Sequence, residues 1–179
     1  MRKTSMKNLS TFLFIALLSM ISGNAWAYDA KINGIYYNFS GEEAEVTFND
    51  KEKYIGDIII PESVNYNGKT YKVTIIGWQA FSNCNISSCF IPSSVKIIKR
   101  EAFQDCRLTS VTIGHAVTEI EANAFDNCSY LNIVNISDIG AWCNISFGYH
   151  SNPLIYSKHL YLNGQEIKEL IIPETVTEI

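Results

Sequence analysis

The sequence has few charges, few prolines and no long apolar run beyond position 27. Charged residues make up 18% of the 179 residues and apolar residues 47%, a balance that excludes a disordered chain. Four prolines and ten glycines exclude collagen-like and linker-dominated chains. Aromatic residues reach 12%, with ten tyrosines, and this favours strands and turns over helices. The composition therefore predicts one β-rich domain of ordinary size.

The segment 1–27 has the features of a secretion signal. Three basic residues precede an almost wholly apolar segment, 12–21, and Ala25-Trp26-Ala27 supplies small residues at both recognition positions of a signal peptidase. We expect cleavage before Tyr28 and a secreted or cell-surface protein. The apolar segment is shorter than the roughly 20 residues that cross a bilayer. A lipid anchor is not expected, because there is no cysteine near the cleavage point. The alternative is a buried N-terminal helix.

Residues 28–179 are predominantly acidic. They hold all eighteen acidic residues but eleven of the fourteen basic ones, so their formal net charge is −7. Because no basic stripe can neutralise phosphates, nucleic acid and anionic membranes are not expected as partners. Nothing after position 27 resembles a second membrane span, so we expect no membrane insertion after signal removal.

A repeat with a constant interval dominates the sequence. The motif Ala-Phe-x-x-Cys begins at Ala80, Ala102 and Ala124, and an isoleucine precedes each copy by four residues. Further upstream, Ile91-Pro92 recurs as Ile113-Gly114. The same frame fits two more segments, Ile60-Pro61 and Ile172-Pro173. Recurrence of so many positions in one register predicts stacked structural repeats.

The spacing within one unit predicts a single coil of a solenoid. Val111 and Ile113 should point to one side of a strand and Thr112 to the other. A proline or glycine then ends the strand, and Ala-Phe-x-x-Cys has the spacing of a single helical turn. Stacked coils would place the repeated phenylalanines over one another, and burying each large apolar side chain stabilises by roughly 1.5–3 kcal/mol. These residues are Phe81, Phe103 and Phe125.

This pattern resembles the BspA-type leucine-rich repeat, a family of secreted and surface proteins of host-associated bacteria and some protozoan parasites. The resemblance rests on Ile91-Pro92-Ser93-Ser94-Val95, on Ile76-Gly77 and on the three Ala-Phe-x-x-Cys segments, and it covers about residues 57–179. It implies a β-rich leucine-rich-repeat solenoid of short parallel strands, with turns or one-turn helices in each repeat. The repeated cysteine looks to take the ladder position that asparagine holds in other leucine-rich repeats.

The repeat also predicts the domain organisation. We expect a signal peptide over 1–27, an N-terminal β cap over 28–56 and a solenoid over 57–179. The solenoid divides into the repeats 57–85, 86–107, 108–130, 131–167 and the incomplete 168–179. Because the last repeat lacks a turn and a cap, we expect a fragment of a longer array; the alternative is a last coil covered by a partner.

Turn signals predict three hairpins. Asn67-Gly68 and Asn163-Gly164 each lie between strand-forming residues. Within the cap, strands over 32–39 and 44–48 are separated by the turn residues 40–43. The expected task of that hairpin is to cover the first coil.

Five cysteines in an exported chain raise the question of disulfides. Cys84, Cys106 and Cys128 lie at equivalent positions of successive coils, so their Cβ atoms should point in parallel and a bridge would be strained. We expect them to be buried free thiols, as we do Cys89 at a core position of its strand. The sequence has no C-x-x-C cluster that predicts zinc, and we expect no metal and no cofactor.

A nucleophilic site is conceivable around Cys143. His150 or His159 and Asp138 lie near it in the sequence, but such groups have to converge in the fold. The simpler interpretation is that Trp142 and Cys143 pack the fourth coil, with both histidines on an exposed loop. The sequence has no Gly-rich phosphate loop, H-E-x-x-H or G-x-S-x-G, so we expect no enzyme and no catalytic residues.

The candidate binding surface is the outward row of strand residues. It comprises Ile59, Phe90, Thr112, Asn135 and Ile171, flanked by Ser88, Ser110 and Glu169. Three of the five central residues are large and apolar, which suits contact with a protein. The alternative is a row of isolated exposed groups with high β-propensity.

The resemblance implies adhesion to host or neighbouring-cell proteins, including extracellular matrix. The predicted function is therefore protein binding by a secreted or surface solenoid. Two alternatives stay open. One is a structural or co-aggregation module that assembles through the open end of the solenoid, and the other is a secreted cysteine hydrolase that uses Cys143.

Overall fold

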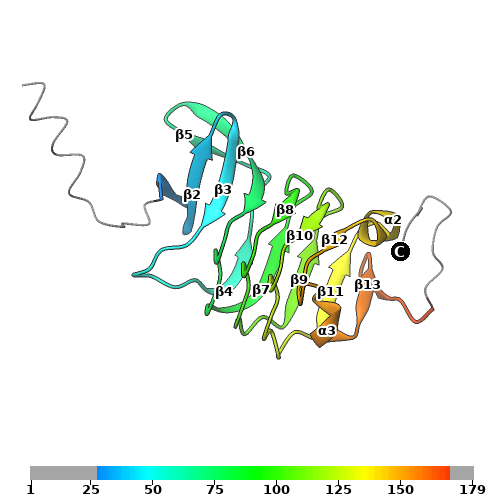
Figure 1. Cartoon of the computed structure of the whole chain (residues 1–179). Coiled ribbons are helices and arrows are strands. Elements are labelled where there is room, and N and C mark those ends of the chain that lie inside the picture. The colour runs from blue at the N-terminus through cyan, green and yellow to red at the C-terminus, as the bar shows by residue number, and fades with distance from the viewer. Residues whose placement is uncertain (1–27, 170–179) are drawn as a thin grey trace, which may run out of the picture.

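Successive coils each contribute one strand to a six-stranded sheet, and the coils stack along one axis (Figure 1). A computed structural model gives the structure of residues 28–169. The strand order is β14-β13-β11-β9-β7-β4, parallel from β4 to β13 and antiparallel between β13 and β14. The strands are β4 (Ile55–Ile59), β7 (Asn85–Ile91), β9 (Ser110–Ile113), β11 (Ile133–Ile136), β13 (Leu160–Leu162) and β14 (Gln165–Glu166).

A second, eight-stranded sheet lies on the other side of the coils and joins them to the N-terminal strands (Figure 1). Its order is β1-β2-β3-β6-β8-β10-β12, and β5 pairs with β6. The strands are β1 (Ala30–Ile32), β2 (Ile35–Ser40), β3 (Glu43–Thr47), β5 (Ser63–Tyr66), β6 (Lys69–Ile76), β8 (Ile97–Ile98), β10 (Glu119–Ile120) and β12 (Ser146–Phe147). Because β3 runs parallel to β6, the N-terminal strands and the repeats share one sheet.

The alternation predicted within each repeat is confirmed. Val111 and Ile113 are buried and Thr112 is half-exposed, as a strand with one core face requires. In register, Val111 pairs with Cys89 on one side and with Val134 on the other. The core is therefore made of columns of equivalent side chains rather than a single cluster around one centre.

The predicted phenylalanine column is present. The ring centroids of Phe81 and Phe103 are 5.0 Å apart, those of Phe103 and Phe125 are 4.9 Å apart, and all three side chains are fully buried. Tyr54 extends the column, because its ring lies 4.8 Å from that of Phe81. This fourth ring was not predicted, since the segment that carries it lacks the Ala-Phe-x-x-Cys motif.

The Ala-Phe-x-x-Cys segments are turns, and the prediction of a single helical turn is wrong. Asn123, just before the third copy, and Asn127, inside it, have φ of 58° and 57°, and the equivalent residues of the other copies also have positive φ. A left-handed residue interrupts a right-handed helix. The backbone N–H of Phe81 therefore donates to the carbonyl of Ala102 in the next coil, at 2.7 Å. The local bonds that remain are those of turns, such as the one from the Cys84 N–H to the Phe81 carbonyl at 3.1 Å.

Two of the three predicted hairpin turns use Asn-Gly as expected. Asn67-Gly68 joins β5 to β6 and Asn163-Gly164 joins β13 to β14, with positive φ at all four residues. The turn at 40–43 joins β2 to β3, as predicted. The predicted continuous strand over 32–39 is wrong, because Asn33-Gly34 forms another turn of the same kind and pairs β1 with β2.

The fourth coil has two short helices in place of the motif turn. The helix α2 (Ile139–Cys143) begins at Asp138, whose side chain accepts a hydrogen bond from the backbone N–H of Ala141 at 2.8 Å. Trp142 is buried, and its ring contacts Phe147 of β12. The helix α3 (Leu154–Ser157) then leads to β13. The coil thereby keeps a strand in each sheet despite its altered sequence.

Candidate functional site: an outward strand row and a groove at its first strand

The structure brings four of the five predicted row residues together on the six-stranded sheet. Ile59 pairs in register with Phe90, Phe90 with Thr112, and Thr112 with Asn135. The exposed fraction is 73% for Ile59 and 47% for Phe90, whereas Thr112 and Asn135 are half-buried. The apolar part of the row therefore lies at its β4–β7 end.

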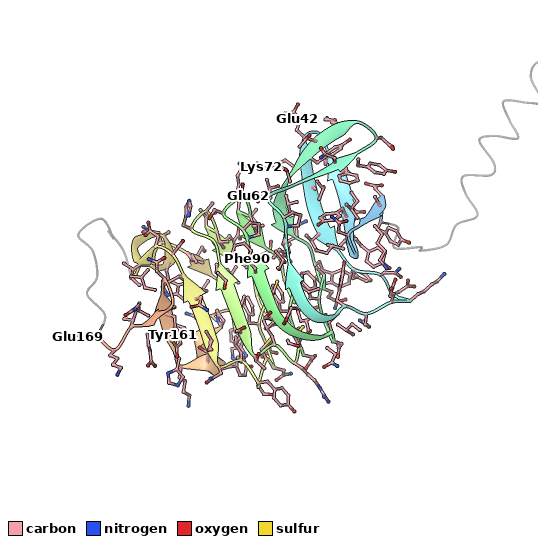
Figure 2. All side chains as sticks on the ribbon, turned by 180° about the vertical axis from the view of Figure 1, so that it is seen from behind. Glu42, Glu62, Lys72, Phe90, Tyr161 and Glu169 are labelled. Atoms are coloured by element: carbon pink, nitrogen blue, oxygen red, sulfur yellow. The ribbon has the colours of Figure 1, made fainter. Side chains whose placement is uncertain are left out.

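Tyr161 is the next member of the row, and the sequence analysis missed it. It pairs in register with Asn135 and is half-buried; Figure 2 labels it on β13, and Phe90 on β7. The signal that could have found it is the alternation Leu160-Tyr161-Leu162, which matches Val134-Asn135-Ile136. Ile171, predicted for the row, lies outside the described residues.

A second outward row runs beside the first and is mostly polar. Asp57 pairs with Ser88, Ser88 with Ser110 and Ser110 with Ile133. The hydroxyl of Ser88 donates to the Asp57 carboxylate at 2.7 Å. Asp57 lies between the exposed Ile55 and Ile59 on the outward side of β4. The outward side of β4 thus carries one carboxylate between two exposed isoleucines.

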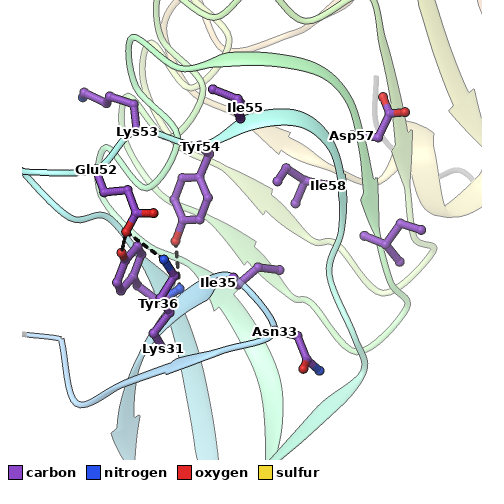
Figure 3. A pocket seen from close by; sticks show the side chains of 12 residues that line it. Lys31, Asn33, Ile35, Tyr36, Glu52, Lys53, Tyr54, Ile55, Asp57 and Ile58 are labelled. Atoms are coloured by element: carbon purple, nitrogen blue, oxygen red, sulfur yellow. Dashed lines mark hydrogen bonds and ion pairs between the residues drawn. The ribbon is translucent and has the colours of Figure 1, made fainter.

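A groove of about 450 Å³ lies between β4 and the β1–β2 hairpin (Figure 3). Its walls come from four of the five residues of β4 and the residues just before it, and from the hairpin around its Asn33-Gly34 turn. The lining residues include Lys31, Asn33, Ile35, Tyr54, Ile58 and Ile59. Since Ile59 belongs both to the outward row and to the groove, the two features form one continuous surface.

A hydrogen-bonded group of side chains stabilises one end of the groove. The Lys31 ammonium lies 2.7 Å from the Glu52 carboxylate, which also accepts a hydrogen bond from the Tyr36 hydroxyl (Figure 3). The hydrogen bond from Lys31 lowers the pKa of Glu52, and the same bond raises the pKa of Lys31. Tyr54 accepts from the backbone N–H of Tyr36 at 2.9 Å and donates to the Thr47 carbonyl. These bonds link the hairpin to the segment that precedes β4.

The cysteine column is buried and makes hydrogen bonds between coils. All five cysteines are free, and the four predicted to be buried are buried. The Cys106 thiol donates to the Phe81 carbonyl at 2.7 Å and the Cys128 thiol to the Phe103 carbonyl at 3.1 Å. Burial raises the pKa of Cys128 to about 12. These thiols therefore have a structural role and are poor nucleophiles.

The candidate nucleophile and bases do not converge. Cys143 lies in α2, and within residues 28–169 it makes no hydrogen bond with a histidine. His150 Nδ1 lies 3.7 Å from the Asp126 carboxylate, and His159 Nδ1 lies 2.5 Å from that of Glu166. Both histidines are exposed, as predicted, and Asp138 caps α2 instead of orienting a base.

Over residues 28–169, no group of three or more His, Cys, Asp and Glu side chains is arranged to hold a metal ion. In the same range, no helix has the length and apolar character needed to cross a bilayer.

Comparison with known sequences identifies the repeat. The model of the BspA type leucine rich repeat region matches residues 46–179 with six copies, which is more than half of the chain. The match begins before the predicted start of the solenoid at 57 and includes the end of β3. No curated protein matches the sequence.

Solved structures of leucine-rich repeat proteins are similar to this chain. One from Bacteroides capillosus is 26% identical with a TM-score of 0.61, over 74% of this chain and 96% of that protein. One from Bacteroides ovatus is 27% identical with a TM-score of 0.53, over 67% of this chain and 34% of that protein. A leucine rich cell surface protein from Faecalibacterium prausnitzii, 21% identical with a TM-score of 0.52, shares the fold over 83% of this chain and 43% of its own. The match thus spans about a third of the Bacteroides ovatus protein.

Proposed function

Because the chain belongs to the BspA-type leucine-rich repeat family, we propose that it is an exported, non-enzymatic protein that binds an extracellular protein through its outward strand row. The observation that carries the proposal is the in-register run of Ile59, Phe90, Thr112, Asn135 and Tyr161. Exposed aromatic and aliphatic side chains held on a rigid sheet are the usual anchors of protein recognition, since they bury large areas at little entropic cost.

The proposal of export is based on the sequence of the residues before Tyr28. A basic start, a short apolar segment and Ala25-Trp26-Ala27 match a cleavable signal, and these residues lie outside the described part of the chain. A secreted or surface location would present the row to host or neighbouring-cell proteins, and extracellular matrix is the partner class that we propose.

We propose that the protein is not an enzyme because of the way its reactive groups are arranged. Both histidines near Cys143 in the sequence pair with carboxylates elsewhere, and the buried thiols donate to backbone carbonyls. A nucleophile without a base in hydrogen-bond reach lacks the activation that a cysteine hydrolase needs.

The test is binding of the purified chain to immobilised extracellular matrix. We expect saturable binding that the double variant Ile59→Ser, Phe90→Ser weakens by about tenfold or more, because it removes the apolar end of the row. Ile155→Ser is the matched control, since Ile155 is 51% exposed but lies on α3, away from the row. An equal loss in both proteins, or no saturable binding of the unaltered chain, would contradict the proposal.

A further inference from the structure

The strand β4 forms an open edge of the six-stranded sheet. It is the last strand in the order and pairs with β7 alone. The Ile60 N–H donates to the Phe90 carbonyl, and the Tyr54 carbonyl accepts from the Asn85 N–H. Because backbone groups of successive strand residues point to alternate edges, the even-numbered residues of this segment face β7. The backbone groups of Ile55, Asp57 and Ile59 consequently face the other edge.

That edge lines the groove between β4 and the β1–β2 hairpin. All three odd-numbered residues are groove-lining residues, and across from them lie Lys31, Asn33 and other residues of the hairpin (Figure 3). Within residues 28–169, no strand of the sheet occupies this position. The groove volume, about 450 Å³, falls in the range of clefts that hold a ligand.

Of the features that block a free strand edge, the five residues of β4 have one charged side chain, that of Asp57, and one register irregularity, between Gly56 and Asp57. These five residues include no proline and no lysine, the residues that most often prevent edge pairing. Gly56, with φ of 74°, interrupts the regular strand, so the regular edge runs from Asp57 to Ile59. Asp57 and Ile59 face the groove with their backbone N–H and carbonyl groups, which can bond to the backbone of an added strand.

We propose that the free edge of β4 binds an extended segment of the partner protein as an additional strand. The inference rests on the proposed function and deepens it by naming the form of the bound segment. Main-chain hydrogen bonds to Asp57 and Ile59 would supply affinity, as in other cases of strand addition. Side chains on the outward side of the added strand would lie beside Ile55, Asp57 and Ile59, which join the groove to the outward row.

Charge further defines the segment. The outward carboxylate of β4 is that of Asp57, so a lysine or arginine beside it is favoured; the other charged residues of the groove, Lys31, Glu52 and Lys53, lie on the hairpin and on the segment before β4. Apolar side chains two residues before and after the basic one would contact Ile55 and Ile59. On the inner side, small β-branched residues would meet Ile35 and Ile58, which are buried at the base of the groove.

The test uses a synthetic peptide of about eight residues, the usual strand length. In it valine, lysine and valine alternate with threonine, and its binding to the 179-residue chain is measured by calorimetry. In one derivative every odd-numbered backbone amide carries an N-methyl group, and in the other every even-numbered amide does. Added as a strand, the peptide presents one set to β4, so one derivative should lose binding by about tenfold or more and the other should retain it. Equal binding of both derivatives, or no binding of the parent peptide, would overturn the proposal.

A pair of variants tests the protein side. Ile59→Pro removes a backbone N–H that faces the groove without removing a bond to β7, whereas Ile59→Thr keeps that N–H. We expect peptide binding to be lost in Ile59→Pro and to be largely kept in Ile59→Thr, with thermal unfolding measured to verify folding. Equal binding by two folded variants would overturn the inference.

The outcomes also separate this inference from the proposed function. If matrix binding falls in the Ile59→Ser, Phe90→Ser variant but not in Ile59→Pro, the row binds its partner and the strand addition is wrong. Light scattering supplies a further criterion: a concentration-dependent dimer that is lost in Ile59→Pro but kept in Ile59→Thr would assign the edge to a second copy, against our proposal.

Discussion

The ring of Phe103 lies 4.9 Å from the ring of Phe125, with 4° between the ring planes, although the two residues belong to different repeats. Phe103 also stacks on Phe81, so its ring lies between two other rings of the column. The three repeats that carry Phe81, Phe103 and Phe125 therefore depend on one another for burial of these rings.

Replacing Phe103 by alanine should destabilise the chain strongly. The substitution removes contacts to two stacked rings and leaves a cavity, so we expect a loss of about 3–5 kcal/mol in the free energy of unfolding. Phe90→Ala is the matched control, because Phe90 is 47% exposed and its loss should cost under about 1 kcal/mol. Urea unfolding followed by circular dichroism measures both. Similar values for the two variants would contradict the column as the main source of stability.

Gly114→Ala should destabilise the fold, because two coils approach each other closely at Gly114. A Cβ atom at Gly114 would lie 2.5 Å from the backbone carbonyl carbon of Pro92, at the equivalent position one coil earlier. Because backbone has to move, we expect a loss of about 3 kcal/mol in the free energy of unfolding.

Gly41→Ala separates crowding from backbone strain. Gly41 has φ of 61° but open space around its Cα, so alanine there should cost about 1 kcal/mol by conformation alone. Chemical unfolding of the two variants in parallel gives the comparison, and a smaller effect for Gly114→Ala would show that the coils can shift apart.

A thiol-reactive probe should label Cys143 and spare the other cysteines in the native chain. Cys143 is half-buried, whereas the other four are buried, and burial raises the pKa of Cys84 and holds that of Cys128 at about 12. Few thiolates therefore exist in the column at mildly alkaline pH. Mass spectrometry should find one label in buffer and five in denaturant. Rapid native labelling of Cys106 or Cys128 would contradict the buried column.

The Glu52 carboxyl should titrate below its ordinary range. Its pKa is lowered first by the hydrogen bond from Lys31 and then by that from Tyr36. A carboxyl whose pKa is lower in the folded chain stabilises the fold above its ordinary pKa, and this contribution is lost as the pH falls through the lowered value. NMR titration of the side-chain carbon checks the shift.

Lys31→Met is the informative variant for Glu52. It removes the ammonium but keeps an unbranched side chain, so the Glu52 pKa should rise toward its ordinary value while the bond from Tyr36 persists. An unchanged titration of Glu52 in this variant would mean that the ion pair with Lys31 does not form in solution.

Much of the fold was predictable because the repeat constrains it. Residues such as Val111 and Cys89, at equal positions in successive units, have to overlie one another if the units are to bury their apolar sides. Asn67-Gly68 and Asn163-Gly164 were recognisable as turns because they favour two successive residues with positive φ. The turn at Asn33-Gly34 obeys the same rule and was overlooked inside an apolar run.

The sequence by itself determined the columns, because a constant period with alternating apolar positions has one way to bury its side chains. The tertiary structure alone decided that Tyr54 extends the ring column and that Ala-Phe-x-x-Cys is a turn. It also decided that the edge of β4 faces a groove. Each of these features depends on contacts or hydrogen bonds between segments that do not share the repeated motif or that lie in different coils, and the spacing within one coil does not specify them.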